Sequence, residues 1–175
     1  EKIANDIGYP VMLKSVYGGG GRGIRIVTND KELREGFESV TGESIAAVGK
    51  SAILVEKFLE KTRHIEYQFA RDTQGNAVHI FERECSIQRR NQKLIEQTPS
   101  PVMDEETRER IGQLVVNAAH AVDYTNLGTA EFLRADNGEF YFIEINARLQ
   151  VEHPISEMVS GLDFVKLQID IANGE

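Results

Sequence analysis

The sequence predicts an α+β fold of two lobes, each built on an antiparallel sheet. Three observations predict it: a strand hairpin with a glycine-rich tip at residues 10–27, further strand patterns joined by turn residues, and an amphipathic helical pattern that begins at Asp104. The strand connections are short and local, which is typical of antiparallel pairing. We expect a small lobe at residues 1–58 and a larger lobe at residues 59–175, with a ligand bound between them.

Composition and charge exclude several classes of function. The chain has 175 residues, is 41% hydrophobic and carries a net charge of −8. Because it is acidic overall, it has no general attraction to nucleic acid or anionic lipid, and we expect no nucleic-acid partner. No apolar run reaches the roughly 20 residues that span a bilayer, so no membrane association is expected.

Localisation and completeness are predicted from the cysteine content and the first residues. The single cysteine, Cys85, cannot form an internal disulfide and fits a reducing compartment, which is the cytoplasm, or the mitochondrial matrix in a eukaryote. The chain starts without methionine in a helical pattern and lacks the arrangement of a signal peptide. We interpret it as a segment of a longer protein.

The first lobe reads as a small sheet covered by a helix. Apolar runs at residues 10–16 and 24–27 predict the two strands of the glycine hairpin. Asn29 and Glu32 resemble a capping box at the start of a helix. Residues 42–50 are expected to be loop or frayed helix.

The rest of the chain predicts strands and helices in alternation. Strands are expected at residues 52–58, 64–71, 77–87, 128–133 and 139–151, with Pro154 ending the last, and short helices at residues 155–160 and 163–172. The helix after Asp104 should bury one apolar stripe against the sheet. Its expected members are Ile111, Leu114, Val115, Ala118 and Val122.

The segment at residues 143–152 carries the strongest chemical signal. Its odd positions are apolar, and its even positions are Glu144, Asn146, Arg148, Gln150 and Glu152. An extended segment would bury the first set and align the second on one face. A solvated sheet face explains the same alternation.

Glu131, on the preceding strand, favours a functional interpretation of that face. Across the hairpin it could meet Glu144 and Asn146, and two carboxylates with an amide oxygen suit Mg²⁺ or Mn²⁺ bound with nucleotide phosphates. The sequence therefore predicts a metal–nucleotide site.

The glycine run at residues 18–23 could surround phosphate oxygens with backbone N–H groups, because its glycines lack Cβ atoms. It joins two strands, so it is neither a Walker A loop nor a dinucleotide-binding fingerprint, both of which open a helix. Lys14 could add a positive charge for phosphate. A flexible turn is the alternative.

Two further stretches offer ligand-binding groups. Glu56, Lys57 and Leu59 lie at a strand end, where backbone groups and an apolar side chain could bind a purine; an ordinary charged strand end is the alternative. Residues 84–93 place Arg89, Arg90 and Lys93 together in an acidic protein, which suits an anionic substrate or a salt-bridged connection.

Taken in order, these motifs resemble biotin carboxylase, within the ATP-grasp superfamily. The specific part is the run at residues 146–154, Asn-Ala-Arg-Leu-Gln-Val-Glu-His-Pro, and the similarity extends along nearly the whole chain. It covers the biotin carboxylase parts of acetyl-CoA, propionyl-CoA, methylcrotonyl-CoA and pyruvate carboxylases and does not separate them.

The resemblance implies a division of roles among the residues named above. The ATP-binding residues would be Lys14, Gly19, Gly20, Gly21, Gly23, Glu56, Lys57, Leu59, His64, Gln88 and Asn91. The two divalent ions, Mg²⁺ or Mn²⁺, would be held by Glu131, Glu144 and Asn146. Bicarbonate would contact Lys93, Arg148, Gln150 and the backbone of Val151, with Glu152 as general base; Glu152, Arg148 and Lys93 would be the catalytic residues.

The resemblance also implies partners: biotin on a carboxyl carrier domain or protein, a carboxyltransferase domain or subunit, and a homodimer or larger assembly. Two positions depart from the family pattern. Tyr17 stands where members often extend the glycine loop, and Asn91 stands where some have a histidine that can carry a proton. The lobe and segment that flank this core in the family are absent from this chain, so we do not expect it to be active alone.

Two alternatives remain at this stage. The chain could be a nucleotide-binding module without chemistry, or another ATP-grasp ligase such as one half of a carbamoyl-phosphate synthetase or a peptide-type ligase. Glu152, Arg148 and Lys93 favour bicarbonate chemistry over an amino-acid acceptor.

Overall fold

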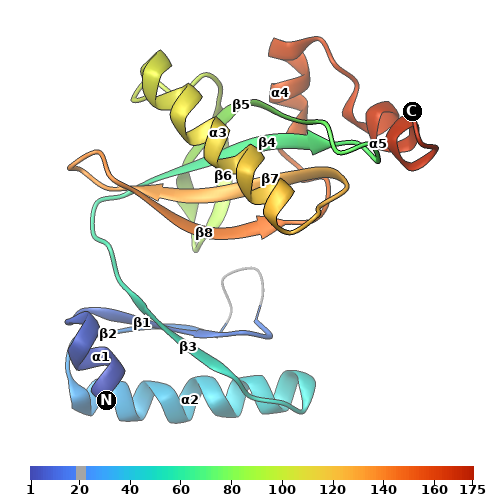
Figure 1. Ribbon diagram of the computed structural model, residues 1–175. Helices are drawn as coiled ribbons and strands as arrows, with labels where there is room; N and C mark the ends of the chain where they lie inside the picture. Colours follow the sequence, from blue (N-terminus) through green and yellow to red (C-terminus); the bar gives the residue numbers. More distant parts are fainter. Residues whose placement is uncertain (19–22) are drawn as a thin grey trace. The chain divides into compact units, whose positions relative to one another are not determined.

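The computed structural model describes residues 1–18 and 23–175 and divides the chain into two compact units (Figure 1). The first comprises Glu1–Glu60 with Arg89–Gln92, and the second Lys61–Gln88 with Lys93–Glu175. The predicted phosphate-binding glycines Gly19, Gly20 and Gly21 lie outside the described residues. None of the helices in the described ranges combines the length and apolar character needed to cross a bilayer.

The first unit is a three-stranded antiparallel sheet with helices packed against it. Its elements are α1 (Lys2–Ile7), β1 (Val11–Ser15), β2 (Ile24–Val27), α2 (Asp30–Val48) and β3 (Ile53–Lys57). The strand order is β2-β1-β3, so the predicted glycine hairpin is confirmed as two paired strands, with Lys14 opposite Ile24. Val11 and Leu13 of β1 are fully buried in a core shared with Leu33 and Val40 of α2.

Helix α2 is longer than the sequence predicted. The expected N-cap is confirmed, because the side chain of Asn29 accepts a hydrogen bond from the backbone N–H of Glu32 at 3.0 Å. The prediction of loop or frayed helix at residues 42–50 is wrong, since a regular helix continues to Val48 and ends at Gly49, whose φ of 71° is left-handed. Buried Ser44 holds this last part: it accepts from the Ser15 hydroxyl at 3.0 Å and donates to the Lys50 carbonyl at 2.8 Å.

The second unit is a five-stranded sheet with three helices. Its elements are β4 (Arg63–Arg71), β5 (Ala77–Arg89), β6 (Gln92–Gln97), α3 (Glu105–Ala121), β7 (Asn126–Arg134), β8 (Phe140–Asn146), α4 (His153–Ser160) and α5 (Phe164–Ala172). The strand order is β6-β5-β4-β7-β8. Central β4 pairs antiparallel with β7 along its whole length, from Arg63 opposite Arg134 to Arg71 opposite Asn126.

The two faces of this sheet have opposite characters. Ile65, Tyr67 and Phe69 of β4 lie with Ala130 and Phe132 of β7 in a core covered by α3, which crosses that face in Figure 1. Because side chains alternate along a strand, the intervening residues point to the other face. They are Glu66 and Gln68 of β4 and Thr129 and Glu131 of β7, all buried and all polar. The candidate functional site lies on this polar face.

The predicted stripe of α3 is correct in part. Ile111 and Val115 are buried as expected, but Leu114 is 51% exposed and Val122 65% exposed. Ala119 continues the face of Ile111 and Val115 into the same core, because residues four apart lie on one face of a helix, and Gly112 and Val116 are buried as well. The N-cap Asp104 accepts from the N–H of Thr107 at 2.8 Å and is confirmed as the start.

The structure corrects two predictions about the last strand: where it ends, and that Pro154 ends it. The last strand ends at Asn146 and not at residue 151, so Arg148, Gln150 and Glu152 do not continue a regular alternation. Pro154 lies in the first turn of α4, where its missing N–H costs nothing. The sequence also missed β6, which follows a tight turn with positive φ at Arg90 and Asn91.

Candidate functional site

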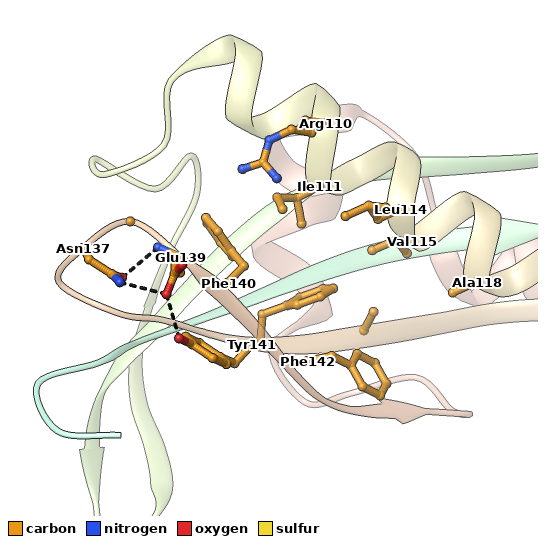
Figure 2. A pocket seen from close by; sticks show the side chains of 13 residues that line it. Arg110, Ile111, Leu114, Val115, Ala118, Asn137, Glu139, Phe140, Tyr141 and Phe142 are labelled. Atoms are coloured by element: carbon orange, nitrogen blue, oxygen red, sulfur yellow. Dashed lines mark hydrogen bonds between the residues drawn. The ribbon is translucent and has the colours of Figure 1, made fainter. Parts of the chain in front are cut away.

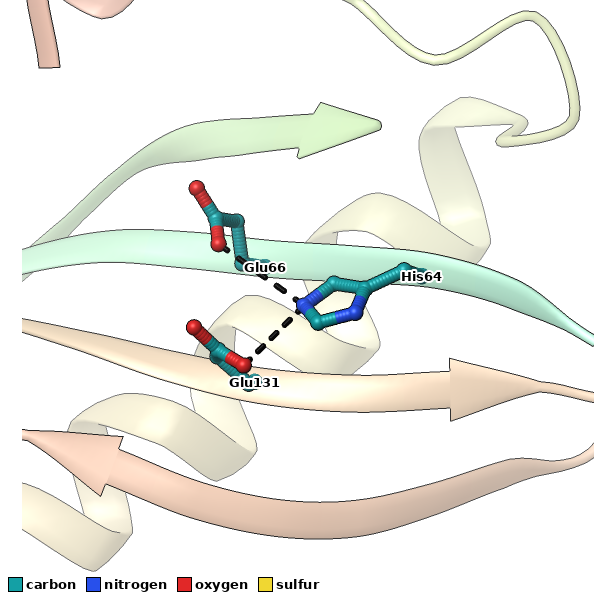
Figure 3. A group of neighbouring side chains, drawn as sticks. All are labelled: His64, Glu66 and Glu131. Carbon is teal, nitrogen blue, oxygen red and sulfur yellow. Dashed lines mark ion pairs between the residues drawn. The ribbon is translucent and has the colours of Figure 1, made fainter. Parts of the chain in front are cut away.

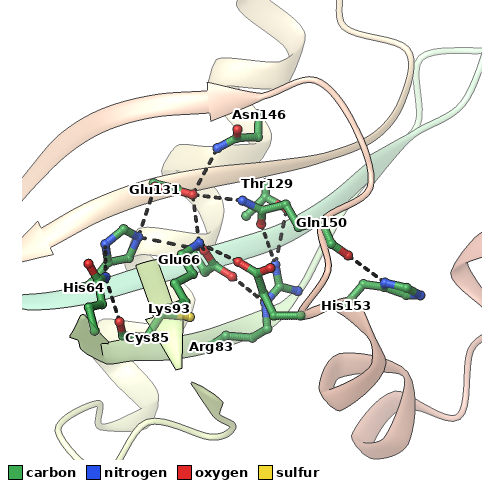
Figure 4. Close-up of polar contacts among 12 residues, drawn as sticks. His64, Glu66, Arg83, Cys85, Lys93, Thr129, Glu131, Asn146, Gln150 and His153 are labelled. Carbon is green, nitrogen blue, oxygen red and sulfur yellow. Dashed lines mark hydrogen bonds and ion pairs between the residues drawn. The ribbon is translucent and has the colours of Figure 1, made fainter. Parts of the chain in front are cut away.

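Lys93, on β6, touches three carboxylates that come from three other segments (Figure 4). Its ammonium group donates to Glu131 on β7 at 3.0 Å, to Glu152 before α4 at 2.6 Å, and to Glu66 on β4. Burial disfavours the charged amine, but Glu66 and Glu131 outweigh this effect and raise the pKa of Lys93 above its usual range. Lys93 is therefore a fixed positive charge, surrounded by carboxylates that a bound cation could also use.

Glu131 lies at the centre of the cluster. Its Oε1 accepts from Lys93 at 3.0 Å, from the Asn146 amide at 3.0 Å and from the Gln150 amide at 2.9 Å. Its Oε2 lies 3.0 Å from Nε2 of His64, a contact that does not have the direction of a hydrogen bond (Figure 3). Burial raises the pKa of Glu131, but His64 and Lys93 outweigh it and hold this pKa far below its usual range. The carboxylate is ionised and available as a metal ligand.

The predicted metal ligands share one face of the β7–β8 hairpin. Glu131 is directly opposite Glu144, and Thr129 is opposite Asn146. Directly opposed residues project to the same side, as do residues two apart. Two carboxylates and an amide oxygen on one face are the donor set that Mg²⁺ and Mn²⁺ prefer, so these residues fit the ions that the sequence predicted. His64, Glu66 and Glu131 also bring their ligand atoms within 4.8 Å of one another.

Glu152 has the charge state that a general base requires. It precedes α4, is half-buried, and its Oε1 accepts from Lys93 at 2.6 Å. Burial raises the pKa of Glu152, but the hydrogen bond and charge of Lys93 outweigh it and keep this pKa below its usual range. Glu152 is therefore a carboxylate at neutral pH.

The predicted anion-binding residues are found in the irregular segment between β8 and α4. Gln150 is buried and reaches Glu131, as described above. Arg148 is exposed, and its guanidinium donates to the Leu149 carbonyl at 3.2 Å and to the side-chain oxygen of Asn146 at 3.4 Å. Val151 is 92% exposed. The structure thus brings Gln150 into the cluster and leaves Arg148 at its exposed edge.

His64 and Gln88, predicted near the nucleotide, are neighbours. Nε2 of Gln88 lies 3.2 Å from Nδ1 of His64 and also donates to the Cys85 carbonyl at 2.8 Å. Cys85 itself is fully buried, and burial raises the pKa of its thiol well above the usual range. It is therefore a buried core side chain.

The remaining predicted nucleotide-binding residues belong to the first unit. Lys14 lies on β1, Gly23 precedes β2 with a φ of 72°, and Asn91 lies in the turn before β6. Glu56 and Lys57 end β3, and Leu59 follows. The Lys57 ammonium group donates to the carbonyl of Gly8 at 2.7 Å. Each stays a predicted ligand of ATP.

Comparison with known proteins places this cluster in a family. The sequence model described as "Carbamoyl-phosphate synthase L chain, ATP binding domain" matches residues 1–175. The chain belongs to this family. Among its relatives, the biotin carboxylase of Nostoc sp. is 52% identical over 174 residues, which are 99% of this chain and 39% of the relative. Several other relatives are named as subunits or chains of carboxylases, among them the propionyl-CoA carboxylase alpha chain of Ruegeria pomeroyi, 51% identical over 99% of this chain and 26% of the relative.

Solved structures of biotin carboxylases show the same fold. The biotin carboxylase domain dimer of the Hydrogenobacter thermophilus 2-oxoglutarate carboxylase, in complex with MgADP, ADP and bicarbonate, matches with a TM-score of 0.97 and 52% identity over 99% of this chain and 38% of that chain. A Campylobacter jejuni biotin carboxylase in complex with a β,γ-ATP ligand matches with a TM-score of 0.97 and 49% identity over 99% and 39%. The predicted ATP-grasp fold and the resemblance to biotin carboxylase are confirmed. The chain spans about two fifths of the length of the biotin carboxylases that it matches.

The sequence did not predict the buried polar residues around Arg83, which contact the cluster. Arg83 on β5 is fully buried, and its guanidinium contacts five residues, none of which was predicted to act except Gln150. The others are Glu66, Gln68, Thr129 and Ser156. One signal was available: Glu82, Arg83 and Glu84 are consecutive charges inside a strand pattern, and consecutive residues cannot all face solvent.

A pocket of about 690 Å³ lies on the opposite face of the sheet (Figure 2). Residues of α3 such as Ile111 and Leu114 line it together with Phe140 and Phe142 of β8. Ala130 and Phe132 also line it, and these alternate along β7 with the site residue Glu131. This pocket is therefore separate from the polar cluster.

Proposed function

We propose that this chain is the ATP-binding core of a biotin carboxylase, which uses ATP to activate bicarbonate and then carboxylates biotin. The observation that carries the proposal is the position of Lys93, which touches both the predicted metal ligand Glu131 and the predicted base Glu152. One cluster thereby joins the groups for a metal–nucleotide complex to those for an anion and its deprotonation. The similarity to a biotin carboxylase domain solved with MgADP and bicarbonate supports it.

ATP would bind through the residues that the sequence predicts. Lys14 and the glycines Gly19, Gly20, Gly21 and Gly23 would hold the phosphates, and Lys57 with Leu59 would contact adenine, beside Glu56. His64, Gln88 and Asn91 bind near the ribose and phosphates. Glu131, Glu144 and Asn146 would hold two Mg²⁺ or Mn²⁺ ions, which would supply positive charge against the transferring phosphoryl group.

Bicarbonate would bind against Lys93, Gln150, Arg148 and the N–H of Val151. Glu152 removes its proton, and a bicarbonate oxygen attacks the γ-phosphorus, so that the bond to ADP breaks and carboxyphosphate forms. Carboxyphosphate releases CO₂ beside biotin, and the phosphate takes the ureido proton. Arg148 stabilises the enolate that results, which then attacks CO₂.

The partners follow from this chemistry. Biotin would arrive on a carboxyl carrier domain or protein, and a carboxyltransferase domain or subunit would pass the carboxyl group to the final acceptor. We propose a homodimer or larger assembly for the whole protein, in the cytoplasm or in the mitochondrial matrix of a eukaryote. The chain alone spans too little of its relatives to be expected to turn over.

The test uses the full-length protein that contains this chain. Phosphate release from Mg-ATP should require bicarbonate and should increase when free biotin is added. The matched comparison replaces biotin with ammonia, because the family also bears the name of carbamoyl-phosphate synthase. ATP cleavage that ignores bicarbonate, or that responds to ammonia and not to biotin, would overturn the proposal.

A further inference from the structure

We propose that Arg83 is a positioning residue of the bicarbonate site: it fixes the Gln150 amide with its NH₂ group toward the anion and holds Glu66 against Lys93. This inference rests on the proposed function, because it assigns the anion to Gln150 and Lys93. Arg83 itself is fully buried and contacts no residue that the proposal gives to ATP.

The guanidinium of Arg83 uses every N–H that it has. A guanidinium carries five donors, one on Nε and two on each terminal nitrogen. Its five acceptors come from β4, β7, the irregular segment after β8, and α4, and Figure 4 labels Glu66, Thr129 and Gln150 among them. They are Glu66 at 2.6 Å, Gln68 at 2.9 Å, Ser156 at 3.0 Å, Thr129 at 3.3 Å and Gln150 at 3.0 Å. A group so fully satisfied and fully buried has one orientation.

That orientation determines which end of the Gln150 amide faces the site. Arg83 is a donor only, so the amide must turn its oxygen toward it, and Oε1 of Gln150 accepts from Arg83 at 3.0 Å. The NH₂ end then points the opposite way and donates to Glu131 at 2.9 Å. A flipped amide would set donor against donor at Arg83 and acceptor against carboxylate at Glu131. The second N–H of this NH₂ group is thereby kept available for an anion.

Arg83 acts on Lys93 through Glu66 in the same manner. Nε of Arg83 donates to Oε1 of Glu66, which leaves Oε2 of that carboxylate to accept from Lys93. Without the guanidinium, Glu66 would be a buried carboxylate with Lys93 as its main cation, and Lys93 would be drawn away from Glu152. Arg83 therefore neutralises part of the negative charge of Glu66 and keeps the Lys93 ammonium group within reach of Glu152.

The contact with Ser156 fastens the segment that bears Gln150. Residues 147–152 have no strand or helix to fix them, so their position depends on side-chain contacts. Ser156 on α4 and Gln150 both accept from Arg83, one on each terminal nitrogen. One buried side chain thus ties both this segment and the helix that follows it to β5.

The test is Arg83→Lys in the full-length protein, measured by bicarbonate-dependent phosphate release. A lysine has three donors and no planar fork, so it can hold Glu66 but cannot also hold Gln68, Thr129, Gln150 and Ser156. We expect the KM for bicarbonate to rise about tenfold, as for the loss of one hydrogen bond to a charged ligand. The KM for Mg-ATP should stay within about twofold. An unchanged KM for bicarbonate, or an equal rise in both, would overturn the inference.

Arg108→Lys is the matched control, because Arg108 pairs with buried Glu82 on the α3 side of the same strand. It should lower thermal stability without changing the KM for bicarbonate. If Arg83→Lys does not fold, Gln150→Glu tests whether the amide NH₂ group binds bicarbonate. This variant keeps an acceptor for Arg83 but replaces the NH₂ group with oxygen. Its KM for bicarbonate should rise at least tenfold, and a wild-type value would refute the amide's role. The proposed function fails separately, if the wild-type protein needs no bicarbonate.

Discussion

Lys93→Met removes the positive charge that touches Glu66, Glu131 and Glu152 together, at nearly constant side-chain length. Glu66 keeps its bond to Arg83, and Glu131 keeps those to Asn146 and Gln150. Glu152 loses the partner that holds its pKa down. Three partly or fully buried carboxylates would then repel one another.

The size of the effect follows from burial. Removing one partner of a buried ion pair costs about 3–5 kcal/mol. The Lys93 side chain is 16% exposed and Arg83 still neutralises Glu66, so we expect roughly 2–3 kcal/mol. This loss of stability corresponds to an increase of about 30- to 150-fold in the equilibrium constant for opening of the sheet. Mn²⁺ should restore part of it, since a cation at Glu131 replaces the missing charge.

Native-state hydrogen exchange of β4 and β7 in the full-length protein measures this opening directly, even where other domains unfold separately. The control is Lys166→Met, which breaks an exposed pair with Asp170 and should change exchange by less than about threefold. Exchange of β4 and β7 that rises less than threefold in Lys93→Met would refute the reasoning. So would a variant that Mn²⁺ stabilises no more than the wild type.

Three other outcomes follow from the cluster. Glu152→Gln should lower bicarbonate-dependent ATP cleavage by about 10²- to 10⁴-fold while Lys93 keeps its other carboxylates, and unchanged turnover would remove Glu152 from the mechanism. Glu144→Gln should weaken Mn²⁺ binding by about tenfold or more in an equilibrium titration of the full-length protein, and equal affinity would exclude Glu144 as a ligand. Glu84 is buried, which raises its pKa, but Ser100 and Arg63 outweigh this effect and lower the pKa below its usual range. The stability that Glu84 contributes is therefore present above about pH 4.5 and lost as pH falls. In Glu84→Gln, the midpoint of thermal unfolding should fall less steeply in acid than in the wild type. Parallel pH profiles of the two midpoints would contradict this.

Local signals predicted most elements well. The caps at Asn29 and Asp104 start α2 and α3 as expected, because a cap is satisfied by an N–H within three residues. The strand pattern failed after Asn146, where alternation continues in the sequence but no neighbouring strand pairs with it in the described structure. Alternation shows that the two faces of a strand differ in polarity, but it does not show where backbone pairing with a neighbouring strand ends.

The sequence by itself determined the type of nearly every element, and it predicted Glu131, Glu144 and Glu152 as residues that would carry the chemistry. Those predictions depend on spacing within a strand, a turn or a motif. Only the tertiary structure decided that Lys93 joins Glu131 to Glu152, and that Arg83 lies beneath them. Arg83 meets acceptors that are between 15 and 73 residues away in the chain. A buried charge is stable only where such distant groups converge, and no local pattern reports that convergence.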